Sequence, residues 1–129
     1  MVDVGGDAVT AYLDTIDGTF NSVFGISFYA LSIALFYGDQ MIAGYVKNLA
    51  NGETFTAIRG EGACLNGNPI QVPTETMLDQ STMSVYAKKF DMTRMMQLGQ
   101  KIRRWSLLGA SALELCYVAC GWLDRFVDM

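Results

Sequence analysis

The sequence predicts a layered α/β fold in two parts, an antiparallel meander over residues 1–73 and the start of a mixed α/β unit over residues 74–129. Short apolar segments joined by tight turns fill the first part, whereas strand-like and helix-like segments alternate in the second. The 129 residues are 51% hydrophobic and 17% charged, enough to bury a core. Because the composition changes near residues 73–80, we expect the architecture to change there.

The first part contains six segments of strand-like composition, separated by turn signals rich in glycine and asparagine. These expected strands cover residues 8–13, 28–36, 40–46, 54–58, 63–65 and 69–72. Asn51 and Gly52 form a dipeptide typical of tight hairpins, which predicts antiparallel pairing of the flanking strands. Residues 20–26 are expected to be a glycine-containing connection.

The second part alternates strands with helices. The expected strands cover residues 81–87, 104–108 and 123–129, and the expected helices cover residues 92–102 and 111–119. Asp91 has the chemistry of a helix N-cap, and Gly121 marks a helix end. The order strand, helix, strand, helix, strand is typical of a layered α/β unit.

The composition excludes several classes of function. A net charge of −4 argues against nucleic-acid binding, which needs clustered cations. With no histidine, the chain has no Ser-His-Asp triad and no His-ligated zinc. The longest apolar run, residues 26–37, is shorter than the ~20 residues of a spanning helix, and no signal peptide is visible, so we expect a cytoplasmic protein without a membrane partner. Cys64, Cys116 and Cys120 are then expected to be reduced and buried thiols.

The motif of greatest chemical interest is Asp14-Thr15-Ile16-Asp17-Gly18-Thr19, at the end of the first expected strand. Two carboxylates crowded at one strand end repel each other unless a hard cation lies between them. Magnesium fits, because it takes oxygen ligands and keeps positions for water and phosphate oxygens. The motif therefore predicts a magnesium site, with Thr19 positioned to hold a water molecule.

Four stretches make the chain resemble the inositol monophosphatase and fructose-1,6-bisphosphatase superfamily of magnesium-dependent, lithium-sensitive phosphatases, in particular its dual-activity archaeal branch. They are residues 13–21 (LDTIDGTFN), 25–33 (GISFYALSI), 60–70 (GEGACLNGNPI), and 109–119 (GASALELCYVA) with 121–124 (GWLD). The resemblance implies an αβαβα sandwich, a small phosphate ester as substrate, Mg²⁺ as cofactor, inhibition by Li⁺ and a homodimer.

The resemblance also implies roles for individual residues. The metal ligands would be the side chains of Asp14 and Asp17 and the carbonyl of Ile16. Asp17 and Thr19 would be catalytic, Thr19 by binding the attacking water. The substrate-binding residues would be Gly18, Thr19, Ala110, Ser111 and Asp128. The reaction would be hydrolysis of inositol monophosphate, fructose 1,6-bisphosphate or both by a metal-activated water.

Other interpretations stay open at this point. The family's upstream glutamate and downstream aspartate have no counterpart within these 129 residues, so the chain by itself is expected to be a core with N- and C-terminal parts missing, binding magnesium weakly and releasing little phosphate. The alternative function is a non-catalytic relative with an assembly role. Asp128 is either a substrate contact or a solvated strand end, and Glu114 is a candidate partner for a basic side chain.

Overall fold

The computed structural model describes residues 9–86 and 92–128, and only the backbone of residues 92–95. Six strands form one antiparallel sheet in chain order. They are β1 (Val9–Asp17), β2 (Ala30–Tyr37), β3 (Gln40–Asn48), β4 (Thr54–Ile58), β5 (Gly62–Leu65) and β6 (Asn68–Ile70). This sheet confirms the predicted meander.

A second sheet of three parallel strands follows. Its central strand is β7 (Thr82–Tyr86), flanked by β8 (Arg104–Ser106) and β9 (Arg125–Asp128). A 3-10 turn, η1 (Leu78–Gln80), precedes it, and helices α2 (Met92–Gly99) and α3 (Ser111–Ala119) connect its strands. The alternation of strands and helices predicted for the second part is therefore confirmed, while the Asp91 cap lies outside the described residues.

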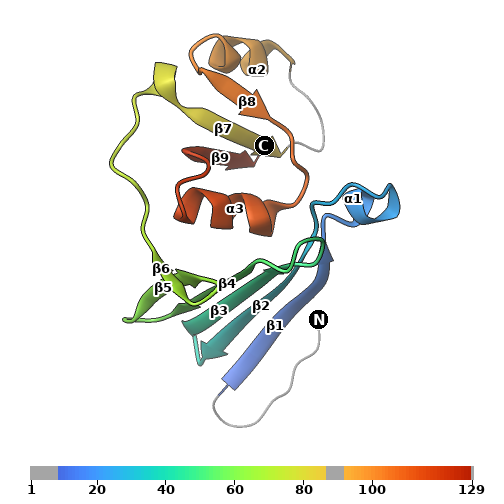
Figure 1. Cartoon of the computed structure of the whole chain (residues 1–129), viewed down its shortest axis with the longest axis vertical. Coiled ribbons are helices and arrows are strands. Elements are labelled where there is room, and N and C mark those ends of the chain that lie inside the picture. The colour runs from blue at the N-terminus through green and yellow to red at the C-terminus, as the bar shows by residue number, and fades with distance from the viewer. Residues whose placement is uncertain (1–8, 87–91, 129) are drawn as a thin grey trace.

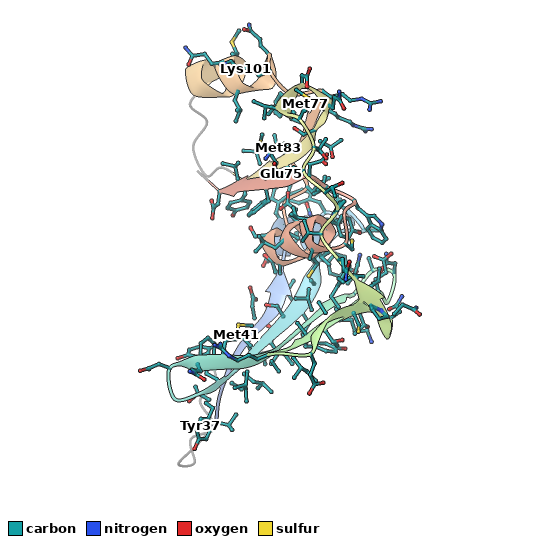
Figure 2. All side chains as sticks on the ribbon, turned by 90° about the vertical axis from the view of Figure 1, so that its left-hand side faces the viewer. Tyr37, Met41, Glu75, Met77, Met83 and Lys101 are labelled. Atoms are coloured by element: carbon teal, nitrogen blue, oxygen red, sulfur yellow. The ribbon has the colours of Figure 1, made fainter. Side chains whose placement is uncertain are left out.

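The elements stack in four layers (Figure 1), namely the six-stranded sheet, α3, the three-stranded sheet and α2. Helix α3 contacts β2 and β3 on one side and β9 on the other, so it is shared by both sheets. The view turned by 90° shows the same order, with Met83 in the upper sheet and the β2–β3 hairpin of Tyr37 and Met41 far from it (Figure 2).

Two apolar clusters hold the layers together. Buried Phe55 of β4 and Leu113 of α3 belong to the cluster that joins α3 to the six-stranded sheet. Met83, Val85 and Ile102 form the cluster that joins the three-stranded sheet to the α2 region. Beside this cluster, an apolar cavity of about 550 Å³ is lined by residues of α3 and of the six-stranded sheet.

The structure corrects several sequence-based expectations. Residues 19–23 form a short helix, α1 (Thr19–Val23), where a connection was expected. It follows Gly18, whose φ of 84° reverses the chain at the end of β1. Helix α2 ends at Gly99 rather than at residue 102, because glycine is a poor helix former and the chain then turns to bury Ile102. The three cysteines are free, as expected, but they are half-buried rather than buried.

None of the described helices has the length and apolar character needed to span a membrane.

Candidate functional site

The acidic motif lies where the end of β1, α1 and the start of α3 come together (Figure 1). The parallel strands β7 and β9 end on the same side of the molecule. In α/β folds, ligands bind at the carboxyl ends of parallel strands, where loops and helix N-termini converge. A cavity of about 680 Å³ opens here, lined by the acidic motif, β7 and the connection from β8 to α3.

A bulge in β1 brings Asp14 and Asp17 to the same cavity. Residues three apart in a regular strand face opposite sides of the sheet. Here Asp14 pairs with Ser32 and Asp17 pairs with Ala30, so β1 has one extra residue between the two aspartates. Both carboxylates consequently line the same cavity. The Ile16 amide within the bulge donates a hydrogen bond of 3.2 Å to Oδ1 of Asp14.

Asp17 is held by a backbone amide of α3, in the second part of the chain. The backbone amide of Ala112, in the first turn of α3, donates a hydrogen bond of 2.7 Å to its Oδ2. Burial raises the pKa of Asp17, and the nearby charge of Asp14 raises it further against the lowering effect of the Ala112 amide. The negative charge of half-buried Asp17 is therefore unfavourable in the absence of a cation.

Gly18 lets the turn after Asp17 pack against the connection before α3. Its φ of 84° is in the left-handed region. A methyl group on Gly18 would lie 3.0 Å from Cβ of Ala110, 3.1 Å from the carbonyl oxygen of Phe28 and 3.2 Å from that of Gly109. Only glycine fits this close approach without displacing backbone.

The hydroxyl of Thr19 lies close to the carbonyl oxygen of Ile16, a predicted metal ligand. It donates a hydrogen bond of 3.0 Å to the carbonyl oxygen of Ile16. A carbonyl oxygen has two lone pairs, so this bond leaves Ile16 able to accept a second partner. Thr19 and Ile16 are both exposed and both line the cavity.

The remaining predicted residues lie near the cavity but are not part of its lining. Ala110 is fully buried in the core under α3, and Ser111 is the first residue of that helix. Asp128 is exposed in β9, where it pairs with Tyr86 of β7, a residue that does line the cavity. The structure thus brings Asp14, Ile16, Asp17, Gly18 and Thr19 together and leaves Ala110, Ser111 and Asp128 at the margin.

Two buried polar residues lie behind the site: Asn21, which no sequence pattern singled out, and Glu114, for which a basic partner was expected. Asn21 of α1 is 5% exposed, and its Nδ2 donates to the carbonyl oxygens of Phe28 at 2.8 Å and Leu108 at 2.7 Å. A polar residue among the aromatic and aliphatic residues of this segment was the available signal. Glu114 is fully buried and accepts a hydrogen bond from the Ser84 hydroxyl. Among the described residues, no basic side chain pairs with it.

The donors available for a metal are all oxygens. Asp14, Asp17 and the Ile16 carbonyl form a hard-oxygen set, which suits Mg²⁺ and argues against zinc or copper. Within residues 9–86 and 92–128, no group of three or more aspartate, glutamate, cysteine or histidine side chains gathers to complete a coordination sphere. The residues therefore fit part of a magnesium site.

Comparison with known proteins identifies sequence relatives. The inositol monophosphatase family model matches residues 2–129. A fructose-1,6-bisphosphatase/inositol-1-monophosphatase from Methanothermobacter thermautotrophicus is 34% identical over 126 residues, covering 91% of this chain and 45% of the relative. Inositol monophosphatase 3 from Solanum lycopersicum is 37% identical over 131 residues, covering 95% of this chain and 49% of the relative. The chain spans about half the length of the curated relatives it matches.

Solved structures show the same fold. The extragenic suppressor protein suhB from Bartonella henselae superposes with a TM-score of 0.87 at 31% identity, covering 92% of this chain and 49% of that protein. An IMPase/NADP phosphatase complexed with Mg²⁺ and phosphate superposes with a TM-score of 0.88 at 28% identity, covering 95% of this chain and 47% of that protein. The layered α/β architecture is therefore that of inositol monophosphatase-type proteins.

Proposed function

The chain belongs to the inositol monophosphatase family, and from this we propose that the gene product containing it is a magnesium-dependent phosphomonoesterase. Its substrates are inositol monophosphate, fructose 1,6-bisphosphate or both. The observation that carries the proposal is the β1 bulge. Because of it, two carboxylates that are three residues apart line the same cavity. Relatives named as phosphatases on these two substrates support the choice of reaction.

In the proposed mechanism, Asp14, Asp17 and the carbonyl of Ile16 would hold magnesium. When bound, magnesium supplies positive charge that lowers the pKa of water and neutralises phosphate oxygens. The Ala112 amide holds Oδ2 of Asp17 and so fixes the orientation of the carboxylate that would bind the cation. A bound cation would offset both the burial of the Asp17 charge and the repulsion from Asp14, which together raise the pKa of Asp17.

The other site residues act on water and substrate. The Thr19 hydroxyl orients the attacking water, and the backbone of Gly18 and Thr19 faces the phosphate. Ser111 with the backbone beside Ala110 binds the alcohol part of the substrate, and Asp128 accepts a hydrogen bond from one of its hydroxyls. Inhibition by Li⁺ and a homodimeric state remain predictions from the resemblance. A cytoplasmic location and the division of the chain at residues 73–80 remain predictions from the sequence.

A phosphate-release assay on the natural gene product tests the proposal. Inositol 1-phosphate and fructose 1,6-bisphosphate are supplied with increasing Mg²⁺, and then with a chelator. We expect Mg²⁺-dependent release, lowered by about 100-fold or more in Asp17→Asn, since even groups one step removed from a metal change activity 10–100-fold. Asp39→Asn, in the exposed β2–β3 turn, is the matched control and should keep full activity. Equal activity of Asp17→Asn and wild type would disprove the metal role of Asp17.

The alternative function applies to the 129-residue chain by itself. The described residues supply two carboxylates and one carbonyl, fewer ligands than near-octahedral coordination of Mg²⁺ needs. We therefore expect this chain alone to bind Mg²⁺ weakly, in the millimolar range or above, and to release little phosphate. Calorimetric titration of the chain beside the natural gene product measures the difference, and robust turnover by the chain alone would rule the alternative out.

A further inference from the structure

We infer that Asn21 and Glu114 are positioning residues that clamp the backbone of Leu108, Asn21 at its carbonyl oxygen and Glu114 at its amide. By doing so, they fix residues 109–112 against Asp17. The inference deepens the proposed phosphatase function and rests on it for its kinetic consequences. It also has a structural consequence that can be measured in a protein without activity.

Asn21 provides the shorter arm of the clamp. Its side-chain amide carries two N–H donors, and it donates to two carbonyl oxygens, that of Phe28 at 2.8 Å and that of Leu108 at 2.7 Å. Leu108 is 87 residues further along the chain. With the side chain only 5% exposed, water cannot easily replace either bond. Asn21 therefore ties α1, which begins at Thr19, to the connection between β8 and α3.

Glu114 provides the second arm, at the amide of Leu108. Its Oε1 accepts a hydrogen bond from the Leu108 amide at 3.4 Å and another from the Ser84 hydroxyl of β7. Glu114 and Ser84 are both fully buried. A carboxylate without exposure is an unfavourable choice for stability alone, because an apolar residue of similar volume often stabilises more. The position of Glu114 next to the site is better explained by its bond to the Leu108 amide, which holds the connection before α3 in place.

The backbone of Leu108, held in this way, leads through Gly109 and Ala110 into the start of α3. Gly109 follows Leu108 with a φ of 85°, and a methyl group there would lie 3.2 Å from Nδ2 of Asn21. Ala110 comes next, fully buried and in close packing with Gly18. Two residues later, the Ala112 amide donates its 2.7 Å bond to Asp17. Displacement of Leu108 would therefore move the residues proposed to bind the alcohol part of the substrate.

The structural test measures amide hydrogen exchange of the peptide that contains residues 109–112, in the natural gene product without substrate. Asn21→Ala and Glu114→Leu each remove one arm. Glu114→Gln keeps an oxygen acceptor at Oε1 and should restore protection. Asn48→Ala is the matched control, because Asn48 is also a buried asparagine, 1% exposed, but bonds to the Ala50 amide in the β3–β4 turn. We expect exchange of residues 109–112 to accelerate by roughly tenfold in the two arm variants and not in the control.

The kinetic test compares the same variants as phosphatases, below their melting temperatures. Small displacements of positioning groups change rates strongly, so we expect KM for inositol 1-phosphate to rise by roughly tenfold in Asn21→Ala. Asn48→Ala should lower thermal stability and leave KM within about twofold of wild type. A loss of activity that only follows the folded fraction, with KM unchanged, would refute the positioning role.

The two tests separate failure of the clamp from failure of the proposed function. An inactive wild-type protein in which Asn21→Ala still accelerates exchange of residues 109–112 contradicts the phosphatase function and supports the clamp. An active protein in which that exchange is unchanged contradicts the clamp and leaves the function standing.

Discussion

The backbone amide of Ala112 donates a 2.7 Å hydrogen bond to the carboxylate of Asp17, although 95 residues separate them. One residue belongs to the first turn of α3 and the other to the last position of β1. Amides in the first turn of a helix have no partner within the helix, and the helix dipole favours negative charge there. The bond therefore satisfies a free donor and stabilises a crowded carboxylate at once, and it joins the six-stranded sheet to the unit that follows.

Removal of that donor should weaken the protein. Ala112→Pro lacks the amide hydrogen, and proline is tolerated in the first turn of a helix. We expect a loss of about 1–2 kcal/mol in the free energy of unfolding, within the range for a hydrogen bond to a charged group. Ala112→Ser is the control, because it changes the side chain at the same position and keeps the amide hydrogen. Urea unfolding measures both, and equal losses would show that the bond is unimportant.

Gly18 should tolerate a side chain less well than another glycine with a similar backbone. Gly18→Ala places a methyl group 3.0 Å from Cβ of Ala110 and 3.1 Å from the Phe28 oxygen. Gly38→Ala, in the β2–β3 turn at a φ of 56°, meets no atom within 4 Å. Left-handed strain alone accounts for about 1–2 kcal/mol in either variant.

The excess loss of stability in Gly18→Ala, which we expect to be at least about 1 kcal/mol, reports the crowding at the site. Thermal unfolding of the two variants side by side gives this difference. If both variants lose the same stability, the close approach of the two segments at Gly18 is wrong.

Local sequence patterns were sufficient for most elements of the fold. The bounds of β4 and α3 agree with those expected, because turn signals and apolar periodicity define them locally. Helix α1 was missed because its support is not local: Gly18 starts it in a left-handed conformation, and Asn21 fixes it through a carbonyl 87 residues away. A five-residue helix gives too short a pattern to be recognised.

The candidate site also has a part that the local sequence predicts and a part that depends on distant contacts. Asp14, Ile16, Asp17 and Thr19 are close in sequence, and one motif was enough to group them. The contact of Ala112 with Asp17 depends on how α3 packs between the two sheets, and no pattern within either segment contains that information. Asp128 was expected on a strand, but its place beside Tyr86 follows from strand order in the parallel sheet.

Asp124 should contribute stability that depends on pH. A side-chain hydrogen bond from Thr76, followed by the amide of Thr82 at 2.7 Å, holds the pKa of Asp124 below its usual value of 3.8. A lowered folded-state pKa means that the contribution is present above pH 3.8 and is lost as the pH falls through the lower folded value.

We therefore expect Asp124→Asn to lower the free energy of unfolding by about 1 kcal/mol at pH 7, since charge-assisted bonds exceed neutral ones by that order. The difference from wild type should vanish at pH values below the folded pKa. Asp39→Asn is the control, an exposed turn carboxylate. Denaturant unfolding between pH 2.5 and 7 checks the profile, and a constant difference over this range would contradict the assignment.

Cys116 should react slowly with alkylating reagents even though it lies on the wall of the apolar cavity. Burial, with a smaller effect of nearby Cys120, raises the pKa of the Cys116 thiol from 9.0 to about 12. Because the thiolate is the reactive form, iodoacetamide at pH 8 should modify Cys116 in the folded protein on the order of 100-fold or more slowly than in the urea-unfolded protein. Mass spectrometry of the peptide gives both rates. The pH profile separates ionisation from access, since a raised pKa makes the rate climb about tenfold per pH unit through pH 9.5, whereas a shielded thiol of ordinary pKa would level off. A plateau near pH 9 would therefore show that shielding, and not the raised pKa, protects Cys116.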